Sequence, residues 1–354
     1  MRVIEVAGSR PSRVVVGERI EAVGRYLPAG RRLVVVTDGN VETAHRGRFP
    51  EASVLTIGTG EGAKTLATVA GLYDRLLRQE ADRSTFLLGV GGGVACDVAG
   101  FVASTFLRGI RFGFVATTLL AQVDASVGGK NGVNLEGYKN IVGTFSQPEF
   151  VLCDLDMLRT LPPGEVVNGM AEILKHALIA DAGLLRFIEE HAQAALALDP
   201  AVVEHLVGES VAIKAAVVGR DEREQGERRT LNFGHTLGHA VERTLGIAHG
   251  EAVSVGMAFA AALSVRRGLL SVDEQTLIRR AMQALRLPCR AAADPERLID
   301  AVRHDKKRDG ETVRFVLLAG IGRAVVEDIP LAELAEAIGA FPDIIEPTRT
   351  GGAP

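Results

Sequence analysis

Residues 122–134, together with Lys139 and Asn140, form the part of the sequence richest in side chains that could do chemistry. They include two lysines, one carboxylate at Asp124, three asparagines and three glycines, without any amphipathic period. A helix or strand packed in a core rarely contains this mixture of residues. We therefore expect the segment to build a site for a charged ligand.

Three of the eight histidines lie close together in the sequence, with a spacing that a metal site could use. His235 and His239 are four residues apart and so share one face of a helix, and His249 follows the break at Gly246. Glu172 adds a carboxylate inside an apolar helical stretch, where a charge without a partner would be costly. A histidine pair of this spacing is more often a surface or capping pair. The third histidine and the glutamate favour a divalent metal site with one open position.

A glycine-rich segment, residues 89–93, ends one expected strand and precedes an expected helix that carries Asp97. Backbone N–H groups at such a helix N-terminus commonly bind a phosphate, so a nucleotide or phosphosugar is the natural ligand. The segment lacks the last glycine of the GxGxxG dinucleotide pattern, because Val94 and Cys96 stand there. A glycine-rich turn that packs helix against sheet is an equally good interpretation of this segment alone.

Two polar loops and several cations could extend such a site. Residues 37–41 follow the first strong strand, where Asp38 could accept hydrogen bonds from a ribose, although Asp-Gly-Asn is also ideal turn sequence. Residues 60–64 are either a polar nucleotide contact or a solvated loop. The cations that could meet a phosphate or carboxylate, or lie in solvent, are Arg108, Arg111, Lys214, Arg228, Lys306 and Lys307.

Length, composition and charge limit these hypotheses. The 354 residues are too many for one ordinary core and predict two domains. Hydrophobic residues make up 47% and charged residues 24%, which is typical of a soluble globular protein. The formal net charge is -4 and the lysines and arginines are dispersed, so the sequence lacks the basic patch of a nucleic-acid-binding protein.

The cysteines and the N-terminus predict a cytoplasmic protein. Cys96, Cys153 and Cys289 are odd in number, widely separated and without a CxxC pair, which argues against a disulfide framework and a thiolate zinc site. The N-terminus lacks the basic and apolar regions of a signal peptide. No apolar run approaches the roughly 20 residues that a membrane helix needs, so we expect no membrane partner.

In the first half of the sequence, β-rich runs alternate with helical patterns. Strands are expected at 32–37, 85–90, 112–116 and 150–153, and helices at 65–79 and 94–107. Thr65 stands where a helix N-cap should be. This alternation predicts an α/β domain with a parallel sheet wrapped by helices.

The Leu-Pro-Pro-Gly sequence at 161–164 marks the expected end of this domain. Beyond it the β-rich runs nearly vanish, apart from one at 312–318. Helices are expected at 169–179, 184–196, 201–219, 234–245, 252–267 and 273–285. The sequence thus predicts an α/β domain over 1–163, a mainly α-helical domain over 164–345 and a disordered tail over 346–354.

Taken in this order, the motifs resemble those of the 3-dehydroquinate synthase family, within the sugar phosphate cyclase superfamily. The match runs from about 37 to about 324. Its most specific parts are 91–97, 117–130, 169–175, 221–224 and 231–239, with Arg108, Lys139 and Asn140. The resemblance implies an N-terminal Rossmann-like domain that binds NAD, a helical C-terminal domain that holds zinc or cobalt, and a substrate cleft between them.

The resemblance also implies roles for individual residues. The metal ligands would be Glu172, His235 and His249. The NAD contacts would be Asp38, Asn40, Gly60, Glu61, Lys64, Gly92, Gly93, Val94, Asp97, Thr117, Thr118, Lys130, Lys139 and Thr160. The substrate and catalytic contacts would be Asp124, Lys130, Asn140, Lys175, Lys214, Arg228, Asn232, His239 and Lys306, in preference to Lys307, with Arg108 reaching a phosphate in the neighbouring subunit of a homodimer.

The implied enzyme is a phosphorus–oxygen lyase of the shikimate pathway, which leads to the aromatic amino acids. It would convert 3-deoxy-D-arabino-heptulosonate 7-phosphate to 3-dehydroquinate and phosphate through transient oxidation by NAD, phosphate elimination, reduction and aldol cyclisation. Three alternatives are another sugar phosphate cyclase, a metal- and NAD-dependent alcohol or glycerol dehydrogenase, and a non-catalytic homologue that binds NAD.

Overall fold

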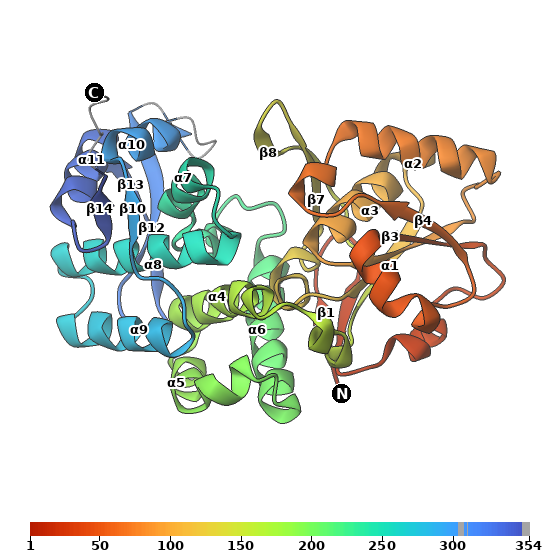
Figure 1. The fold of residues 1–354 in the computed structure, drawn as a ribbon, viewed down its shortest axis with the longest axis horizontal. Helices are drawn as coiled ribbons and strands as arrows, with labels where there is room; N and C mark the ends of the chain where they lie inside the picture. Colours follow the sequence, from red (N-terminus) through yellow and green to blue (C-terminus); the bar gives the residue numbers. More distant parts are fainter. Residues whose placement is uncertain (304–307, 310, 349–354) are drawn as a thin grey trace, which may run out of the picture. The chain divides into compact units, whose positions relative to one another are not determined.

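The computed structural model describes residues 1–303, 308–309 and 311–348. By their mutual contacts the residues form two compact units: Met1–Val166 with Pro200–Arg223, and Val167–Asp199 with Glu224–Pro354. Both units are drawn in Figure 1. The chain passes from the first unit into the second, returns to the first for one helix, and then completes the second.

Among the described residues, the first unit contains a seven-stranded sheet in the order β1-β2-β9-β6-β5-β3-β4. The strands are β1 (Arg2–Val6), β2 (Ser12–Val16), β3 (Leu33–Asp38), β4 (Ser53–Ile57), β5 (Phe86–Gly91), β6 (Arg111–Ala116) and β9 (Phe150–Cys153). Neighbouring strands pair in parallel except β1 and β2, which pair antiparallel. The predicted parallel-sheet architecture is confirmed, and β1, β2 and β4 add to the expected strands.

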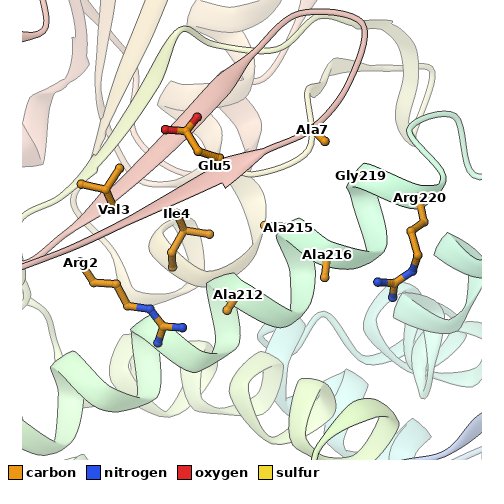
Figure 2. A pocket seen from close by; sticks show the side chains of 10 residues that line it. All are labelled: Arg2, Val3, Ile4, Glu5, Ala7, Ala212, Ala215, Ala216, Gly219 and Arg220. Atoms are coloured by element: carbon orange, nitrogen blue, oxygen red, sulfur yellow. The ribbon is translucent and has the colours of Figure 1, made fainter.

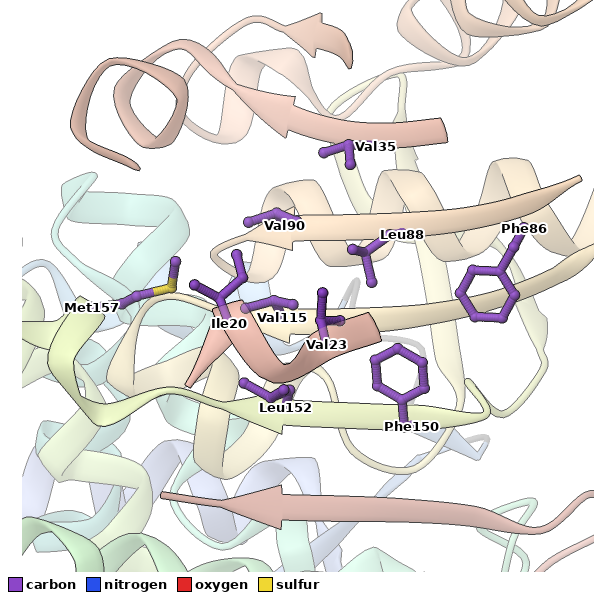
Figure 3. Packing of buried hydrophobic residues seen from close by; sticks show 10 residues of the cluster. All are labelled: Ile20, Val23, Val35, Phe86, Leu88, Val90, Val115, Phe150, Leu152 and Met157. Atoms are coloured by element: carbon purple, nitrogen blue, oxygen red, sulfur yellow. The ribbon is translucent and has the colours of Figure 1, made fainter. Parts of the chain in front are cut away.

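The central strands are buried on both faces, as parallel strands beneath helices must be. Every residue of β5 and β9 is buried. Phe86 of β5 and Phe150 of β9 stack with their ring centroids 5.9 Å apart. Val23, from the short helix η1 (Ile20–Arg25), belongs to the same cluster (Figure 3). This close-packed core gives the polar residues at the strand ends a rigid base.

Helices and single turns surround this sheet. The helices are α1 (Gly39–His45), α2 (Leu66–Arg78), α3 (Gly93–Thr105) and α6 (Pro200–Arg220), and the turns are η2 (Arg46–Arg48), η3 (Glu61–Ala63), η4 (Phe106–Arg108), η5 (Ala121–Ala125) and η6 (Leu155–Thr160). Thr65 caps α2 as predicted, because its side chain accepts a hydrogen bond from the N–H of Thr68. Leu72 and Leu76 are buried, whereas Leu77 is 61% exposed and lies outside the apolar face.

Helix α6 packs at the antiparallel edge of this sheet, in contact with β1 and β2. Ion pairs tie β1 to the helix: the N-terminal ammonium lies 2.6 Å from Glu204, and Nη1 of Arg2 donates to Glu209 at 2.6 Å. A groove of about 520 Å3 runs between the two elements (Figure 2). Its lining residues are Arg2, Val3, Ile4, Glu5, Ala7, Ala212, Ala215, Ala216, Gly219 and Arg220.

Strands β7 (Lys130–Leu135) and β8 (Tyr138–Phe145) form a separate antiparallel hairpin in the first unit. Glu136 and Gly137 make its two-residue turn with positive φ angles of 50° and 78°, as a tight hairpin turn of this kind requires. The sequence does not predict this hairpin, because glycine, asparagine and lysine interrupt the alternation that marks a strand.

The second unit is mainly helical, as predicted. Its helices are α4 (Pro163–Ala180), which begins in the last residues of the first unit, α5 (Ala182–Leu196), α7 (His235–Leu245), α8 (His249–Arg266), α9 (Val272–Ala284), α10 (Pro295–Arg303) and α11 (Leu331–Ala340). The strands β11 (Arg308–Asp309), β12 (Thr312–Leu318) and β13 (Ala324–Pro330) pair antiparallel, and β10 (Ala291–Ala293) pairs in parallel with β14 (Ile345–Pro347). The expected strand at 312–318 is β12.

Helix α8 is the centre of the second unit. It contacts α7, α9 and β12, and Figure 1 shows it between α7 and α9. Residues 252–264 are all buried, which explains why this helix is apolar on every face. Within the described part of the chain, no helix combines the length and the apolar character needed to cross a bilayer.

The C-terminal segment for which we expect disorder begins at 346. Glu346 and Pro347 are part of β14, where they pair with Ala292 and Ala293 of β10. Residues 349–354 lie outside the described residues.

Candidate active site

Glu172, His235 and His249 converge within the second unit. Glu172 lies in α4, while His235 and His249 are the first residues of α7 and α8. The Nε2 atoms of His235 and His249 lie 3.6 and 3.4 Å from Oε1 of Glu172. One possible ligand atom from each residue lies within 4.8 Å of the other two. The structure therefore brings together the three residues expected as metal ligands.

Glycines allow the N-terminus of α7 to pack closely against the middle of α8. Gly234 precedes α7 in the left-handed conformation, with φ of 78°. A Cβ atom on Gly256 of α8 would lie 1.9 Å from the carbonyl oxygen of Gly234, so the helices approach more closely than any side chain there would permit. The rings of His235 and His249 lie with their centroids 5.4 Å apart.

Glu172 is a buried carboxylate among cationic groups. Its side chain is 0% exposed and forms an ion pair with Lys175, one helical turn along α4. Burial alone would raise the pKa of Glu172, but Lys175 and the two histidines hold this pKa well below its ordinary value. The carboxylate is therefore charged at neutral pH and can act as an anionic ligand.

The two histidines differ in their protonation. Burial lowers the pKa of His235 well below its ordinary value, so this ring is neutral. Burial would also lower the pKa of His249, but the neighbouring carboxylates of Glu172 and Glu242 raise it to about 9. Nδ1 of His249 lies 3.2 Å from Oε2 of Glu242. Nδ1 of His235 lies 3.1 Å from the carbonyl oxygen of Phe233.

This arrangement fits a divalent cation. Two imidazole nitrogens and a carboxylate from three converging elements are a ligand set typical of zinc. Despite the ion pair with Lys175, neither carboxylate oxygen of Glu172 has a hydrogen bond of normal geometry. A bound cation would compensate this buried charge. Glu242 already holds the second nitrogen of His249, as a carboxylate usually does for a metal-bound histidine.

His239 lies beside the three ligands. Its ring centroid is 5.4 Å from that of His235 and 6.1 Å from that of His249. It shares a second cluster of possible ligand atoms with Glu242 and His249. Glu242 is not among the residues predicted from the sequence, although its position seven residues after His235 places it on the same helix face.

Other expected substrate residues of the second unit are strongly buried cations and one amide. Lys175 is 1% exposed and Arg228 is 2% exposed. Asn232, at the end of η7 (Glu227–Asn232), donates a hydrogen bond to Glu224. Cations buried to this degree require anionic partners or ligands. Lys306 lies outside the described residues.

In the first unit, Asp38 ends β3 and caps α1. Its Oδ1 accepts hydrogen bonds from the N–H groups of Asn40 at 2.9 Å and Val41 at 3.1 Å. Its Oδ2 lies 3.4 Å from where a Cβ on Gly91, at the end of β5, would stand. The turn interpretation of residues 37–41 is thus correct, and Asp38 also faces the carboxyl edge of the sheet, where ligands of such sheets bind.

Gly92 and Gly93 join β5 to α3 at the same edge. A Cβ atom on Gly92 would lie 2.9 Å from the side chain of Thr118, and one on Gly93 would lie 3.2 Å from that of Ala125. Thr117 donates its N–H to the carbonyl oxygen of Gly91 at 3.0 Å. The glycines are needed for this packing, and they also leave the half-buried N-terminus of α3, with Val94 in its first turn, open to an anion.

The loop at residues 60–64 is exposed at Gly60, Glu61 and Gly62 but is anchored at Lys64, which is buried. Lys64 forms an ion pair with Asp97 of α3, and the two side chains are 5% and 15% exposed. Burial raises the pKa of Asp97 to about 6, although Lys64 acts in the opposite direction. Glu61 accepts a hydrogen bond from Nδ2 of Asn134 in β7 at 2.7 Å. Side chains of this loop therefore have fixed partners in α3 and β7.

The expected substrate residues of the first unit lie at its π-helical turn and on its hairpin. Asp124 is in η5, a single π-helical turn of a kind that often marks functional sites. Nζ of Lys214 in α6 donates to its Oδ1 at 2.6 Å. Lys130 begins β7, whereas Lys139 and Asn140 lie in β8, and all three are exposed.

Thr160 and Arg108 lie at the ends of single turns. Oγ1 of Thr160, in η6, lies 2.9 Å from Nε2 of the buried His45, a partner that is not predicted from the sequence. Arg108, in η4, has φ of 65° and follows Leu107 at 50°, a conformation that few side chains adopt. With Arg10 it lines a cavity of about 320 Å3. Backbone strain of this kind favours a functional role for Arg108.

Solved structures share this fold over nearly the whole chain. A 2-deoxy-scyllo-inosose synthase complexed with carbaglucose-6-phosphate, NAD+ and Co2+ has a TM-score of 0.85 at 29% identity, over 95% of this chain and 98% of that one. A 2-epi-5-epi-valiolone synthase from Streptomyces hygroscopicus with NAD+ and Zn2+ bound has a TM-score of 0.85 at 28% identity, over 96% and 99%. A probable glycerol dehydrogenase from Sinorhizobium meliloti, at 0.66 and 18%, shares the fold alone.

Sequence comparisons identify the family. Residues 54–168 match the 3-dehydroquinate synthase N-terminal model, and residues 169–308 match the C-terminal model. The 3-dehydroquinate synthase of Symbiobacterium thermophilum is 43% identical over 317 residues, which are 86% of this chain and 88% of that protein. That of Paracoccus denitrificans is 42% identical over 330 residues, 88% and 89% of the two chains. Because both models and the relatives together cover most of its length, the chain belongs to the 3-dehydroquinate synthase family.

Proposed function

We propose that this protein converts 3-deoxy-D-arabino-heptulosonate 7-phosphate to 3-dehydroquinate and phosphate, with NAD and zinc or cobalt as cofactors. The convergence of Glu172, His235 and His249 is the observation that carries the proposal. These three residues would form a cation site, and Lys175 lies beside it, where it can contact a substrate. Relatives at 42% to 43% identity carry the name of this activity. Solved cyclases at 28% to 29% identity hold NAD+ with Co2+ or Zn2+.

The second unit would contribute the metal and part of the substrate contacts. Glu172, His235 and His249 would hold the cation. The cation would supply Lewis acidity and NAD would supply reversible hydride transfer. These three residues would then be poor general bases, since coordination occupies the lone pairs that they would need. Lys175 keeps a positive charge beside them. The remaining substrate contacts proposed for this unit are Arg228, Asn232, His239 and Lys306.

The first unit would contribute the cofactor contacts. The N-terminus of α3 at Gly92 and Gly93 suits the pyrophosphate, because its N–H groups and dipole favour an anion. Asp38 stands where an acidic residue commonly accepts from a ribose hydroxyl. The Lys64–Asp97 ion pair fixes the loop at residues 60–64. The remaining proposed contacts are Asn40, Gly60, Glu61, Val94, Thr117, Thr118, Lys130, Lys139 and Thr160.

The first unit would also bind the substrate phosphate and a hydroxyl. Lys130 and Asn140 of the exposed hairpin would bind the phosphate. Asp124, whose carboxylate accepts a hydrogen bond from Lys214, would bind the hydroxyl. A substrate with both a phosphate and a carboxylate explains why a protein of net charge -4 places so many cations at its proposed site residues.

The test is net turnover. Incubated with the heptulosonate phosphate, catalytic NAD+ and zinc or cobalt, the protein should release phosphate without accumulating NADH. Accumulation of one NADH per substrate would instead indicate a dehydrogenase. Phosphate release only from a hexose phosphate, or from a heptulose phosphate without a carboxylate, would indicate another sugar phosphate cyclase. Chelator-treated protein, before and after the metal is restored, serves as the matched control.

We further propose a homodimer in which Arg108 of one subunit meets the substrate phosphate of the other. The exposure of Arg108 and its strained backbone support this role. A cytoplasmic location is also proposed, because Cys96, Cys153 and Cys289 are free thiols, as expected in a reducing compartment.

A further inference from the structure

Asn134, in β7, joins the proposed cofactor loop to the strand that carries Lys139 and Asn140. Its backbone N–H donates to the carbonyl oxygen of Lys64 at 2.9 Å. Its side-chain Nδ2 donates to Oε1 of Glu61 at 2.7 Å. Its Oδ1 accepts the backbone N–H of Asn140 at 2.9 Å. One half-buried amide thus contacts the loop at residues 60–64 on one side and the hairpin strand β8 on the other.

The hairpin is irregular where Asn134 stands. Leu135 pairs with Tyr138, and Val133 pairs with Val142, so two steps along β7 correspond to four steps along β8. The additional residues of β8 form a bulge that contains Lys139 and Asn140. Bulges of this kind redirect side chains near functional sites. The bulge therefore determines where the two proposed ligand contacts point.

The bulge needs support because of its backbone conformation. Asn140 has φ of 53°, in the left-handed region that few side chains other than those of asparagine, aspartate and glycine adopt. At this turn of the backbone, its N–H is directed at Asn134 rather than along a regular ladder of hydrogen bonds. The Oδ1 atom of Asn134 thus fixes the orientation of Asn140.

The other contact of Asn134 supports the cofactor loop. This loop turns at Gly60, with φ of 72°, and continues into the single turn η3. Glu61 is bonded to Asn134, and Lys64 is held by Asp97 and, through its carbonyl oxygen, by the backbone of Asn134. The loop and the bulge consequently share one hydrogen-bonding partner.

We propose that Asn134 is a positioning residue that holds the cofactor loop and the phosphate-binding bulge in register with each other. An amide suits both tasks, because it donates toward the carboxylate of Glu61 and accepts from the N–H of Asn140. Aspartate would repel Glu61, and an apolar residue would leave both partners unsatisfied. The inference rests on the proposed function, which assigns the loop and Lys139 to NAD and Asn140 to the substrate phosphate.

A double-mutant cycle between positions 61 and 134 tests the proposal. Asn134→Asp keeps the acceptor for Asn140 but sets a second carboxylate against Glu61. When Glu61→Gln is also present, the amide of residue 61 can donate to the carboxylate of residue 134, so the hydrogen bond returns with its direction reversed. In the native background, Asn134→Asp should weaken NAD+ binding and lower kcat/KM for the heptulosonate phosphate about tenfold or more. In the Glu61→Gln background, the same substitution should change both quantities less than about threefold.

The control is Glu136→Gln, which removes a carboxylate from the exposed turn of the same hairpin and should leave both quantities unchanged. Equal losses in the two backgrounds, or a loss confined to one ligand, would overturn the proposal. A purely structural role would lower the melting temperature while leaving the NAD+ dissociation constant and the KM intact. If Asn134→Asp does not fold, Asn134→Ala is measured in its place, and unchanged constants for both ligands overturn the proposal.

The cycle is measured first by calorimetry with NAD+ alone, which requires no turnover. An unchanged NAD+ dissociation constant in Asn134→Asp overturns the inference about Asn134. Absence of phosphate release by the unmodified protein overturns the proposed function instead, so the two failures are distinguishable.

Discussion

Lys214 donates to Asp124 twice, to its backbone carbonyl oxygen at 2.5 Å and to its Oδ1 at 2.6 Å. The lysine is 6% exposed and thus holds both the backbone and the side chain of the π-helical turn. We predict that Lys214→Met lowers kcat/KM about a hundredfold, because displacing a substrate-positioning group by about 1 Å has effects of this size.

Steady-state phosphate release measures this loss. The control is Arg78→Met, which breaks the exposed Arg78–Asp74 pair within α2 and should leave kcat/KM unchanged, since exposed pairs contribute little. Undiminished kcat/KM in Lys214→Met would exclude a positioning role for the Lys214–Asp124 contact.

His249→Ala should abolish stoichiometric metal binding. The substitution removes one of the three proposed ligands and also the imidazole that Glu242 contacts. Elemental analysis after chelation and restoration of zinc should show one metal per chain in the unmodified protein and much less in the variant. His191→Ala changes a histidine that stacks on Phe187 in the same unit and should retain the metal. A variant at position 249 with full metal content would remove His249 from the ligand set.

NAD+ affinity should depend on pH through Asp97. Its folded-state pKa is about 6, so the carboxylate is charged above this pH and takes up a proton below it. Protonation removes the anionic partner of Lys64 and loosens the loop at residues 60–64. We therefore predict that NAD+ binding weakens as the pH falls through about 6, and that the change is reversible.

Calorimetric titrations between about pH 5 and pH 8 measure this dependence. Asp97→Asn should bind NAD+ more weakly at neutral pH and without an inflection near 6. Asp74→Asn, at an exposed position in α2, should keep the native profile. An inflection that persists in Asp97→Asn would assign the titration to another group.

The alternation of strand and helix patterns predicts the fold correctly where the sequence of an element shows the pattern that its burial requires. The strands at 85–90 and 150–153 are apolar throughout because helices cover both faces of the sheet, and this pattern is visible without the structure. Strand β1 lies at the sheet edge with Val3 exposed, and β8 is exposed along most of its length. Neither has the pattern that burial imposes, so neither can be recognised from sequence.

The site residues are predictable by type but not by partner. Glu172 is predicted as a site residue because it is a carboxylate in an apolar helix, and His235 and His239 are predicted because of their spacing. No local pattern pairs Lys214 with Asp124, which is 90 residues away, or His45 with Thr160, which is 115 residues away. Contacts at such separations depend on how whole elements pack, and the sequence of either element alone does not determine them.

Mixed dimers test the proposed role of Arg108. Arg108→Ala and His249→Ala should each be inactive alone. If Arg108 acts on the neighbouring subunit, a mixed dimer contains one site with both residues intact, and random mixing should restore about a quarter of the native activity. Activity is measured after the two variants have exchanged subunits. Continued inactivity of a mixture shown to contain mixed dimers would place Arg108 in the site of its own chain.

The close contact between α7 and α8 gives the last prediction. A Cβ atom on Gly256 would lie 1.9 Å from the carbonyl oxygen of Gly234, so Gly256→Ala must push the two helices apart. His235 and His249 begin these helices, and their separation would grow with the displacement. Overpacking of this kind costs about 1 to 3 kcal/mol in stability. The variant should therefore melt at a lower temperature and bind zinc more weakly, although it alters no ligand.

Gly71→Ala separates the effect of packing from that of any glycine substitution in a helix. No atom lies within 4 Å of a Cβ built on Gly71, on the exposed side of α2, so alanine there should be neutral or stabilise by up to about 1 kcal/mol. Zinc affinity and melting temperature, measured together, distinguish two outcomes. If Gly256→Ala lowers the melting temperature but leaves zinc affinity unchanged, the metal site tolerates displacement of its helices. A parallel loss of both would show that the contact between α7 and α8 sets the distance between the two histidines.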